Sequence, residues 1–292
     1  MALSLTAIHE RFGVEVHDIQ LAGLTDEGFA DIRDAFERHS LLLFRNQTID
    51  DATHIALAKR FGAIENRQDM TLKADADFKV PTVSNLTKNG TVADESDLQT
   101  LNLKANMLWH CDSTFLPIPA LTNILIARTV TKEKGHTEFA TSRAGWADMP
   151  EVMKNKLRGR MARHHYAHSR ARISEELSKL PEFNKWPERS WKTVWTNPVT
   201  GDEALYLASH AFAIEGMDAE EGSQLIDEAL GFVTQPEYVY AHAWREDDVV
   251  IWDQRAVLHR ATPWNYNEPR KLSSICVSAS SEDGLDLMRS IG

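Results

Sequence analysis

The feature that most constrains this chain is the stretch 106–115, in which one residue separates His110 from Asp112. The stretch is apolar and aromatic, lacks Gly and Pro, and is closed by Pro117, so we predict a β-strand. Side chains at positions i and i+2 of a strand leave the same face of the sheet. A strand here would therefore point His110 and Asp112 the same way and Cys111 the opposite way.

An imidazole and a carboxylate on one face supply two ligands to a divalent metal, and a third ligand is needed. Two histidines and one carboxylate that leave other positions open suit non-haem Fe(II), which must also bind a cosubstrate and oxygen. His259 ends the second of two β-rich runs around Asp253-Gln254 and is the best candidate. Taken alone, a His-x-Asp pair is weak evidence, and a histidine at a strand end is more often a hydrogen-bonded surface residue.

Three segments taken together resemble a known family. They are Leu108-Trp109-His110-Cys111-Asp112-Ser113-Thr114-Phe115, Gly135-His136-Thr137-Glu138-Phe139, and Trp252-Asp253-Gln254-Arg255 through His259-Arg260 followed by Arg270. In order and spacing they are similar to the Fe(II)/2-oxoglutarate-dependent dioxygenases, most closely to the taurine and 2,4-dichlorophenoxyacetate dioxygenases. The resemblance covers nearly the whole chain, from Gly13 to Arg270.

The resemblance implies a site and a reaction. His110, Asp112 and His259 would hold Fe(II), with 2-oxoglutarate and O2 as cosubstrates. Arg270 falls at the family's arginine position and would bind the far carboxylate of 2-oxoglutarate through the two parallel hydrogen bonds that a guanidinium makes. Thr137 matches a hydroxyl donor to the same carboxylate. Related halogenases carry a small residue in place of the carboxylate ligand, so Asp112 implies a hydroxylase that converts 2-oxoglutarate to succinate.

The sequence departs from the family where substrate choice is decided. Taurine and phenoxyalkanoate enzymes commonly carry a second arginine four residues after the first, and here that position is Ser274. Losing a charge-assisted hydrogen bond forgoes about 1.5–3 kcal/mol, so the usual anion anchor is weakened or relocated. On a strand, the even separation places Ser274 on the same side as Arg270. The candidate replacement anchors are Lys73, Lys79, Lys104, Arg163 and His210. Of these, His210 follows a strand after which the family carries pocket residues.

Several further residues have both a functional and a plainer interpretation. Asn85 matches a segment that lies beside the substrate in the family, yet Asn is also a common turn residue. His136 replaces the acidic residue of the family's Gly-Asp-Thr motif, and an outward orientation is the simpler interpretation. His164, His165 and His168 suggest a second metal site, which we disfavour because adjacent side chains face different ways on a helix or a strand.

The pattern of short β-rich runs predicts a mostly β protein with peripheral helices, built as a sandwich or jelly roll. The resemblance implies a double-stranded β-helix of that kind, and we expect one domain over 1–292. The polar segment 66–103 is expected to be a lid, and 171–196, which holds three tryptophans, an insertion over the barrel mouth. Predicted helices cover 26–40, 51–61, 146–163 and 219–232.

Composition limits the partners. The net charge of −11 argues against nucleic acid and anionic membranes. Two cysteines, Cys111 and Cys276, are too few for a disulfide framework and fit a reducing cytosol. No apolar run has transmembrane length, and the N-terminus lacks the apolar region of a signal peptide. We therefore expect a cytoplasmic protein with a small-molecule substrate, and a homo-oligomer stays open.

These observations favour a dioxygenase that hydroxylates a small organic acid such as an aryloxyalkanoate. Two alternatives stay open. The first is the same chemistry on an uncharged or bulkier aromatic substrate, which Ser274 and the tryptophan-rich segment 171–196 permit, or else on a sulfonate. The second is a catalytically idle metal-binding β-barrel, against which the full set of metal and cosubstrate residues argues.

Overall fold

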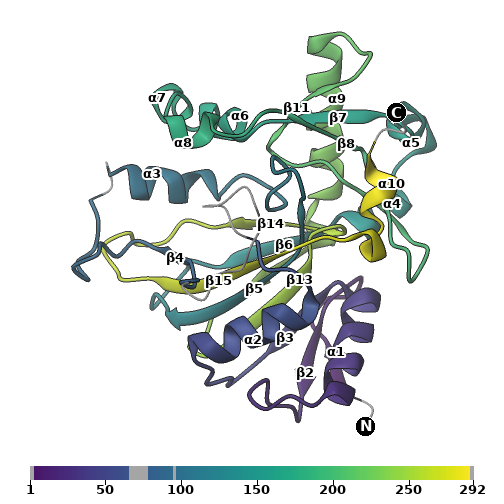
Figure 1. Ribbon diagram of the computed structural model, residues 1–292. Helices are drawn as coiled ribbons and strands as arrows, with labels where there is room; N and C mark the ends of the chain where they lie inside the picture. Colours follow the sequence, from purple (N-terminus) through teal and green to yellow (C-terminus); the bar gives the residue numbers. More distant parts are fainter. Residues whose placement is uncertain (1–2, 66–77, 95–96, 290–292) are drawn as a thin grey trace.

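The structure is a computed structural model that describes residues 3–65, 78–94 and 97–289. Its centre is a seven-stranded sheet in the order β1-β2-β3-β13-β5-β15-β4, and a three-stranded sheet, β12-β6-β14, packs against it (Figure 1). The strands of the larger sheet are β1 Ser4–Ala7, β2 Val14–His17, β3 Leu41–Phe44, β13 Val249–Asp253, β5 Ala120–Thr129, β15 Lys271–Ser278 and β4 Thr82–Ser84. Those of the smaller sheet are β12 Val239–His242, β6 Thr137–Thr141 and β14 Val257–Ala261.

Strand periodicity divides the core into two layers. In β3, Leu41 and Leu43 pack between the two sheets, whereas Leu42 and Phe44 pack on the other face, against the helices. All four are buried, as expected for a central strand covered on both faces. The expected sheet-rich architecture with helices at its periphery is confirmed.

Two helices cover the outer face of the larger sheet. They are α1, Asp26–His39, and α2, Asp51–Phe61, as the sequence predicts. Thr25 caps α1 by accepting a hydrogen bond from the Gly28 amide at 3.1 Å, and Asp50 caps α2 through the Thr53 amide at 2.8 Å. These caps explain why both helices begin where they do.

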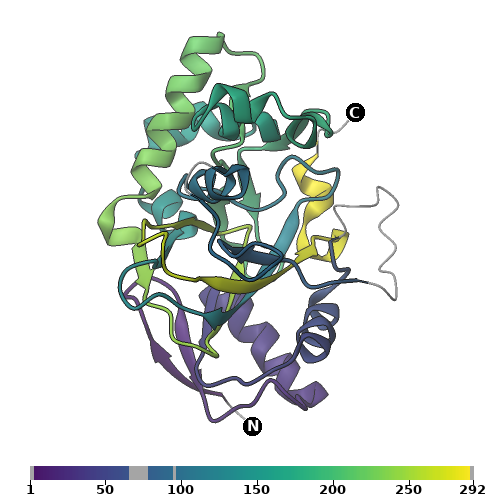
Figure 2. The ribbon, with the colours of Figure 1, turned by 90° about the vertical axis from the view of Figure 1, so that its left-hand side faces the viewer.

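A long excursion between β6 and β12 lies at one end of the two sheets (Figure 2). Its helices are α4 Ser142–Asp148, α5 Glu151–Leu157, α6 Tyr166–Ala171, α7 Glu175–Ser178, α8 Pro181–Asn184 and α9 Ala219–Val233. Its strands are β7 Met161–His164, β8 Arg189–Lys192, β9 Val194–Thr196, β10 Glu203–Leu205 and β11 Ala211–Ile214. The segment 171–196 thus has regular structure, and its tryptophans, Trp186, Trp191 and Trp195, are buried packing residues.

The predicted strand over 106–115 is wrong. Helix α3, Leu98–Ala105, precedes a run of turns in which the one β-contact is an isolated bridge between His110 and His259. The backbone leaves the extended conformation at Ser113, whose φ is 62°, and the Asp112 amide donates to the side chain of Gln254 at 3.0 Å. The apolar composition reflects burial of a loop rather than a strand.

The predicted helix over 146–163 is also wrong in extent. Pro150 separates α4 from α5, and the second helix ends before Gly159, whose φ of +76° favours glycine. The chain then enters β7. Three features therefore replace one helix because a proline and a glycine interrupt the helical pattern.

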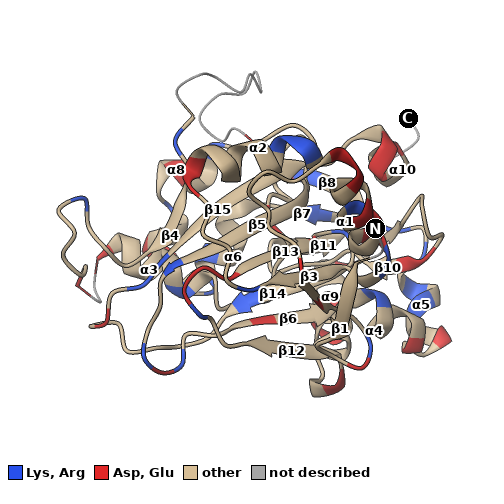
Figure 3. Cartoon of the chain, turned by 90° about the horizontal axis from the view of Figure 1, so that it is seen from below, with Lys and Arg blue, Asp and Glu red and all other residues tan. Residues whose placement is uncertain are grey.

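The segment predicted as a lid is described only in part, since 66–77 lies outside the described residues. Its remainder contains β4 and most of α3. No helix in the described part of the chain is long and apolar enough to cross a membrane. The remaining short elements are η1 Pro236–Tyr238, η2 Ser281–Asp283 and α10 Leu285–Met288. Acidic and basic residues are interspersed over the helices and loops (Figure 3).

Candidate active site

His110, Asp112 and His259 lie together at one end of the sheets. His110 Nε2 is 3.8 Å from Asp112 Oδ1, and His259 Nε2 is 3.8 Å from Asp112 Oδ2. Among the described residues, these three are the group of His, Cys, Asp and Glu side chains able to share one metal ion, with ligand atoms all within 4.8 Å of one another. The convergence expected from the sequence is present, although a loop rather than a strand produces it.

The two histidines present ring nitrogens to the same point. His110 Nδ1 donates to the Leu108 carbonyl oxygen at 2.7 Å, so Nε2 is the atom that can bind a metal. Burial lowers the pKa of His259 to about 3, with the neighbouring His110 acting in the same direction, so the ring of His259 is neutral at physiological pH. Two imidazoles and a carboxylate fit a divalent iron.

The carboxylate of Asp112 is held by a side chain from the turn after β13 and by one from β5. Gln254, after β13, donates to Asp112 Oδ2 at 2.6 Å, and Asn123, on β5, donates to the same oxygen at 2.9 Å. The thiol of Cys276, on β15, lies 3.7 Å from it. These contacts set the plane of the carboxylate relative to the two imidazoles.

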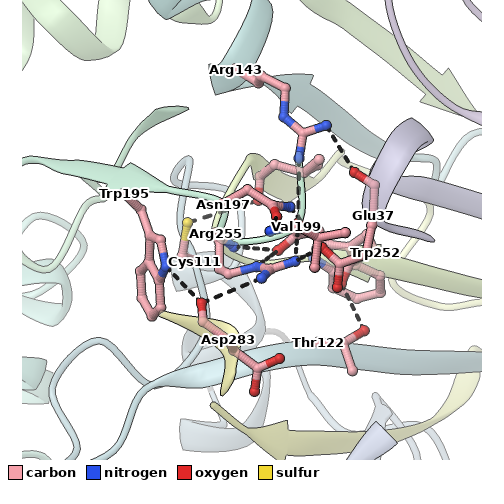
Figure 4. Close-up of polar contacts among 12 residues, drawn as sticks. Glu37, Cys111, Thr122, Arg143, Trp195, Asn197, Val199, Trp252, Arg255 and Asp283 are labelled. Atoms are coloured by element: carbon pink, nitrogen blue, oxygen red, sulfur yellow. Dashed lines mark hydrogen bonds and ion pairs between the residues drawn. The ribbon is translucent and has the colours of Figure 1, made fainter. Parts of the chain in front are cut away.

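Gln254 is itself held by a buried polar cluster. Its neighbour Arg255 bonds Asp253 at 2.8 Å and Glu37 at 2.6 Å, and Asn197 donates to Glu37 at 2.7 Å (Figure 4). Burial alone would lower the pKa of Arg255, but Asp253 and Glu37 raise it, so the guanidinium stays charged. The turn that carries Gln254 is thus tied to α1.

The triad opens onto a cavity of about 710 Å³. Arg270 and Thr137, the residues expected to bind 2-oxoglutarate, both line this cavity. Thr137 Oγ1 accepts a hydrogen bond from Trp244 Nε1 at 2.9 Å, which leaves the hydroxyl proton for another acceptor.

Arg270 is suited to an incoming carboxylate. It is 3% exposed, and burial lowers its pKa to about 10, which leaves it charged near neutral pH. No carboxylate of the described residues lies within ion-pair distance of it, whereas its guanidinium donates to the Gly135 carbonyl oxygen at 3.2 Å and stacks over Trp264 at 5.0 Å. A buried, uncompensated cation is costly unless an anion binds there. The pocket therefore fits a dicarboxylate cosubstrate.

The residues expected to contact the substrate have different environments. His210 and Ser274 line the cavity. Asn85 does not, because its amide is used in the scaffold: Nδ2 donates to the Tyr266 and Glu268 carbonyl oxygens, and Oδ1 accepts from the Arg270 amide at 2.9 Å. The Asn85 side chain thus ties its own strand end to the segment 266–270.

Among the candidate anion anchors, Lys79 lines the cavity and Lys73 lies outside the described residues. Lys104 packs over the Tyr266 ring, and Arg163 pairs with Glu188, so neither reaches the cavity wall. The histidines of 164–168 form no metal-binding group within the described chain.

Sequence reasoning missed Arg170, Asn123 and Gln254. Arg170 is 5% exposed and lines the cavity from α6. The sequence does place Arg170 four residues after Tyr166, a spacing that brings two side chains together on one face of a helix. In the structure Arg170 Cζ lies 4.3 Å from the centroid of the Tyr166 ring. The partners of Asp112 could not be found, because they come from strands that only the tertiary fold brings together.

A triad of two histidines and one carboxylate beside a buried arginine, at the end of two packed sheets, defines a metal-dependent enzyme that binds an acidic cosubstrate. The chain belongs to the taurine catabolism dioxygenase TauD, TfdA family, whose sequence model matches residues 4–276. It is therefore an Fe(II)- and 2-oxoglutarate-dependent oxidoreductase. The enzyme class expected from the sequence is confirmed, and the idle metal-binding barrel is not supported.

Named relatives cover nearly all of the chain. The alpha-ketoglutarate-dependent 2,4-dichlorophenoxyacetate dioxygenase of Burkholderia sp. strain RASC is 32% identical over 93% of this chain and 93% of its own. The (S)-phenoxypropionate/alpha-ketoglutarate-dioxygenase of Sphingobium herbicidovorans is 31% identical over 97% of this chain and 98% of its own. The crystal structure of AAD-2 in complex with Mn(II) and N-oxalylglycine has a TM-score of 0.88 and 30% identity, covering 96% of this chain and 98% of that one.

Proposed function

We propose that this enzyme hydroxylates an aromatic acid of the aryloxyalkanoate type. The observation that carries the proposal is a cationic, aromatic wall in the same cavity as the metal triad. Phe115 and Tyr166 stack with ring centroids 3.9 Å apart, His210 packs edge-on at 5.1 Å from Phe115, and the buried Arg170 adjoins them. An aryl ring with a carboxylate has the shape and charge for such a wall. The relatives named for dichlorophenoxyacetate and phenoxypropionate support this class.

His110, Asp112 and His259 would hold Fe(II), and Arg270 with Thr137 would hold the far carboxylate of 2-oxoglutarate. When bound, the metal and 2-oxoglutarate would allow O2 to act as the oxidant: one oxygen atom would enter a substrate C–H bond and the other would enter succinate, as 2-oxoglutarate loses CO2. Hydroxylation of a carbon beside an ether oxygen gives a hemiacetal, which falls apart. A cavity of about 710 Å³ leaves room for both small molecules.

Arg170 is our proposed anchor for the substrate carboxylate. Its guanidinium donates to Ser169 Oγ at 2.9 Å, Asn102 Oδ1 at 3.0 Å and the Tyr166 hydroxyl at 3.1 Å. These bonds orient the plane of the guanidinium at the cavity wall. A fixed planar donor set costs little conformational entropy when it binds a carboxylate.

We also infer that the two sheets are those of a double-stranded β-helix in one domain. Support comes from the shared core between them and from the likeness to AAD-2. The larger core cluster runs from Val14 to Met288, which favours one unit. A reducing cytoplasm is our proposed location, since neither Cys111 nor Cys276 forms a disulfide.

The test is a substrate screen read by succinate formation with Fe(II), ascorbate and 2-oxoglutarate. Phenoxyacetate and both enantiomers of 2-phenoxypropionate are compared with taurine and with anisole, a neutral aryl ether. We expect substrate-dependent succinate from at least one phenoxyalkanoate and little from taurine. Faster turnover of anisole than of every phenoxyalkanoate would instead favour the uncharged-substrate alternative.

A further inference from the structure

Ser274 occupies the position at which the family commonly carries a substrate-binding arginine. Its hydroxyl, however, donates a hydrogen bond to the side chain of Asn123. We propose that Ser274 is a positioning residue for the metal site, acting on Asp112 through the amide of Asn123. This inference rests on the proposed role of Asp112 as a metal ligand. It assigns Ser274 to the metal rather than to the substrate.

Two consecutive hydrogen bonds make the connection. Ser274 Oγ donates to Asn123 Oδ1 at 3.0 Å, and Asn123 Nδ2 donates to Asp112 Oδ2 at 2.9 Å. Asn123 is 5% exposed, so water has little access to its amide. The three side chains therefore form one continuous path from β15 to the carboxylate.

The strand register brings the path together. In the antiparallel pairing of β5 with β15, Asn123 lies opposite Cys276 and Leu125 lies opposite Ser274. Asn123 and Ser274 are thus diagonal neighbours on one face, and both line the cavity. The adjacent Ser273 faces the other way, where its hydroxyl accepts a hydrogen bond from Arg128 at 3.2 Å.

The serine acts on the amide in two ways. The carboxylate of Asp112 requires a donor, so it turns Nδ2 of Asn123 toward itself and Oδ1 toward Ser274. The serine then supplies the hydrogen bond that this buried oxygen needs. Donation to the amide oxygen also polarises the amide and strengthens its N–H as a donor. Outer hydrogen bonds of this kind orient metal-binding carboxylates.

A substrate-binding serine and a positioning serine predict different measurements. If Ser274 bound substrate, Ser274→Ala would change the KM for the substrate and leave metal affinity alone. If it acts through Asn123, the same change weakens Mn(II) binding when neither substrate nor 2-oxoglutarate is present. Gln254 still donates to the same Asp112 oxygen, so the loss is partial.

The experiment measures the Kd for Mn(II) of the metal-free full-length protein, from the electron paramagnetic resonance signal of free Mn(II). We expect Ser274→Ala to weaken binding by roughly 3- to 10-fold. Ser274→Thr keeps the hydroxyl and should bind Mn(II) like the wild type. The matched control is Ser273→Ala, which removes a hydroxyl from the same strand on the opposite face and should leave the Kd unchanged.

A double-mutant cycle locates the effect. In an Asn123→Ala background, Ser274→Ala should have no further effect on the Kd, because the path is already broken. Three results would each overturn the proposal. Ser274→Ala could weaken Mn(II) binding equally in the wild-type and Asn123→Ala backgrounds, or it could leave the Kd at the wild-type value. Ser274→Thr could also bind Mn(II) as weakly as Ser274→Ala. Asp112→Ala distinguishes failure of the metal site from failure of the role of Ser274. If Asp112→Ala keeps wild-type Mn(II) binding, Asp112 is not a metal ligand, whatever the Ser274 variants show.

Discussion

His110 and His259 are joined by their backbones as well as by their proximity to one metal position. The His110 amide donates to the His259 carbonyl oxygen at 3.0 Å, and the His259 amide donates to that of His110 at 2.9 Å. This reciprocal pair holds the two rings with centroids 4.1 Å apart. The fold therefore places the two imidazole rings side by side.

The first prediction concerns the triad. His110→Ala and Asp112→Ala should each abolish retention of iron and turnover, because each removes one of three ligands. The backbone pair between His110 and His259 survives both changes, so the folded state should persist. Iron content by atomic absorption and circular dichroism check this. Unchanged iron in both variants would remove the site assignment.

The second prediction concerns 2-oxoglutarate. Arg270→Ala should raise its KM by roughly 10- to 100-fold, the equivalent of about 1.5–3 kcal/mol for a charge-assisted hydrogen bond. Thr137→Val should raise it less, since one neutral donor is lost. Mn(II) affinity in the absence of 2-oxoglutarate serves as the control and should not change. A KM effect confined to the prime substrate would give Arg270 a different role.

The third prediction concerns the proposed anchor of the substrate carboxylate. Arg170→Met keeps much of the side-chain volume and removes the charge, so the KM for a phenoxyalkanoate should rise by roughly 10-fold or more while the KM for 2-oxoglutarate stays similar. Lys79→Met is the matched control, since it removes the other substrate-side cation of the described cavity wall. If only the lysine variant loses the substrate, the anchor lies at Lys79.

The fourth prediction concerns the buried cluster beneath Gln254. Arg255→Met removes one cation from each of two buried carboxylates, leaving Glu37 with Arg33 at 2.7 Å and Asp253 with Arg143 at 3.7 Å, and should lower the free energy of unfolding by about 3 kcal/mol. Arg38→Ala breaks an exposed ion pair with Asp34 and should cost no more than about 1 kcal/mol. Denaturant unfolding of both variants makes the comparison. Equal small losses would mean that the cluster contributes little.

The fifth prediction concerns pH. Burial lowers the pKa of His54 to about 4 and that of His164 to about 3, from 6.5 in the unfolded chain. Both are neutral when folded, so they favour the folded state above pH 6.5. That stability is lost as the pH falls toward 4 for His54 and toward 3 for His164. At pH 5 the loss is about 2 kcal/mol for each.

The check compares urea unfolding at pH 7 and pH 5 for the wild type and His164→Leu. The variant lacks one of the buried histidines whose pKa is lowered, so its stability should fall less between these pH values. Parallel losses in the two proteins would show that His164 is accessible to protons in the folded state.

The sequence predicted the site better than the local backbone. His110, Asp112 and His259 converge, yet 106–115 is not a strand, because hydrophobicity reports burial and a buried loop has the same composition. The helices α1 and α2 were predictable from their caps and apolar spacing. Pro150, which is visible in the sequence, divides the predicted helix 146–163 between α4 and α5.

What the sequence could not predict depends on contacts between distant segments. The roles of Asn123 and Ser274 require the register of β5 against β15. Asn85 looked like a substrate residue because of its position, whereas the structure commits its amide to three backbone groups. No local pattern distinguishes these outcomes, since each is decided by partners more than a hundred residues away.

The two walls of the cavity come from different kinds of structure, and this has a consequence for how the enzyme changes over time. The wall with Arg270 is built where the chain enters β15 and on Gly135, where an added Cβ would lie 2.8 Å from Thr131 Oγ1. The wall with Tyr166 and Arg170 is built on the short helix α6, which contributes no side chain to the triad. Changes confined to α6 could therefore alter which substrates the enzyme accepts. The residues proposed to hold the metal and 2-oxoglutarate would stay as they are.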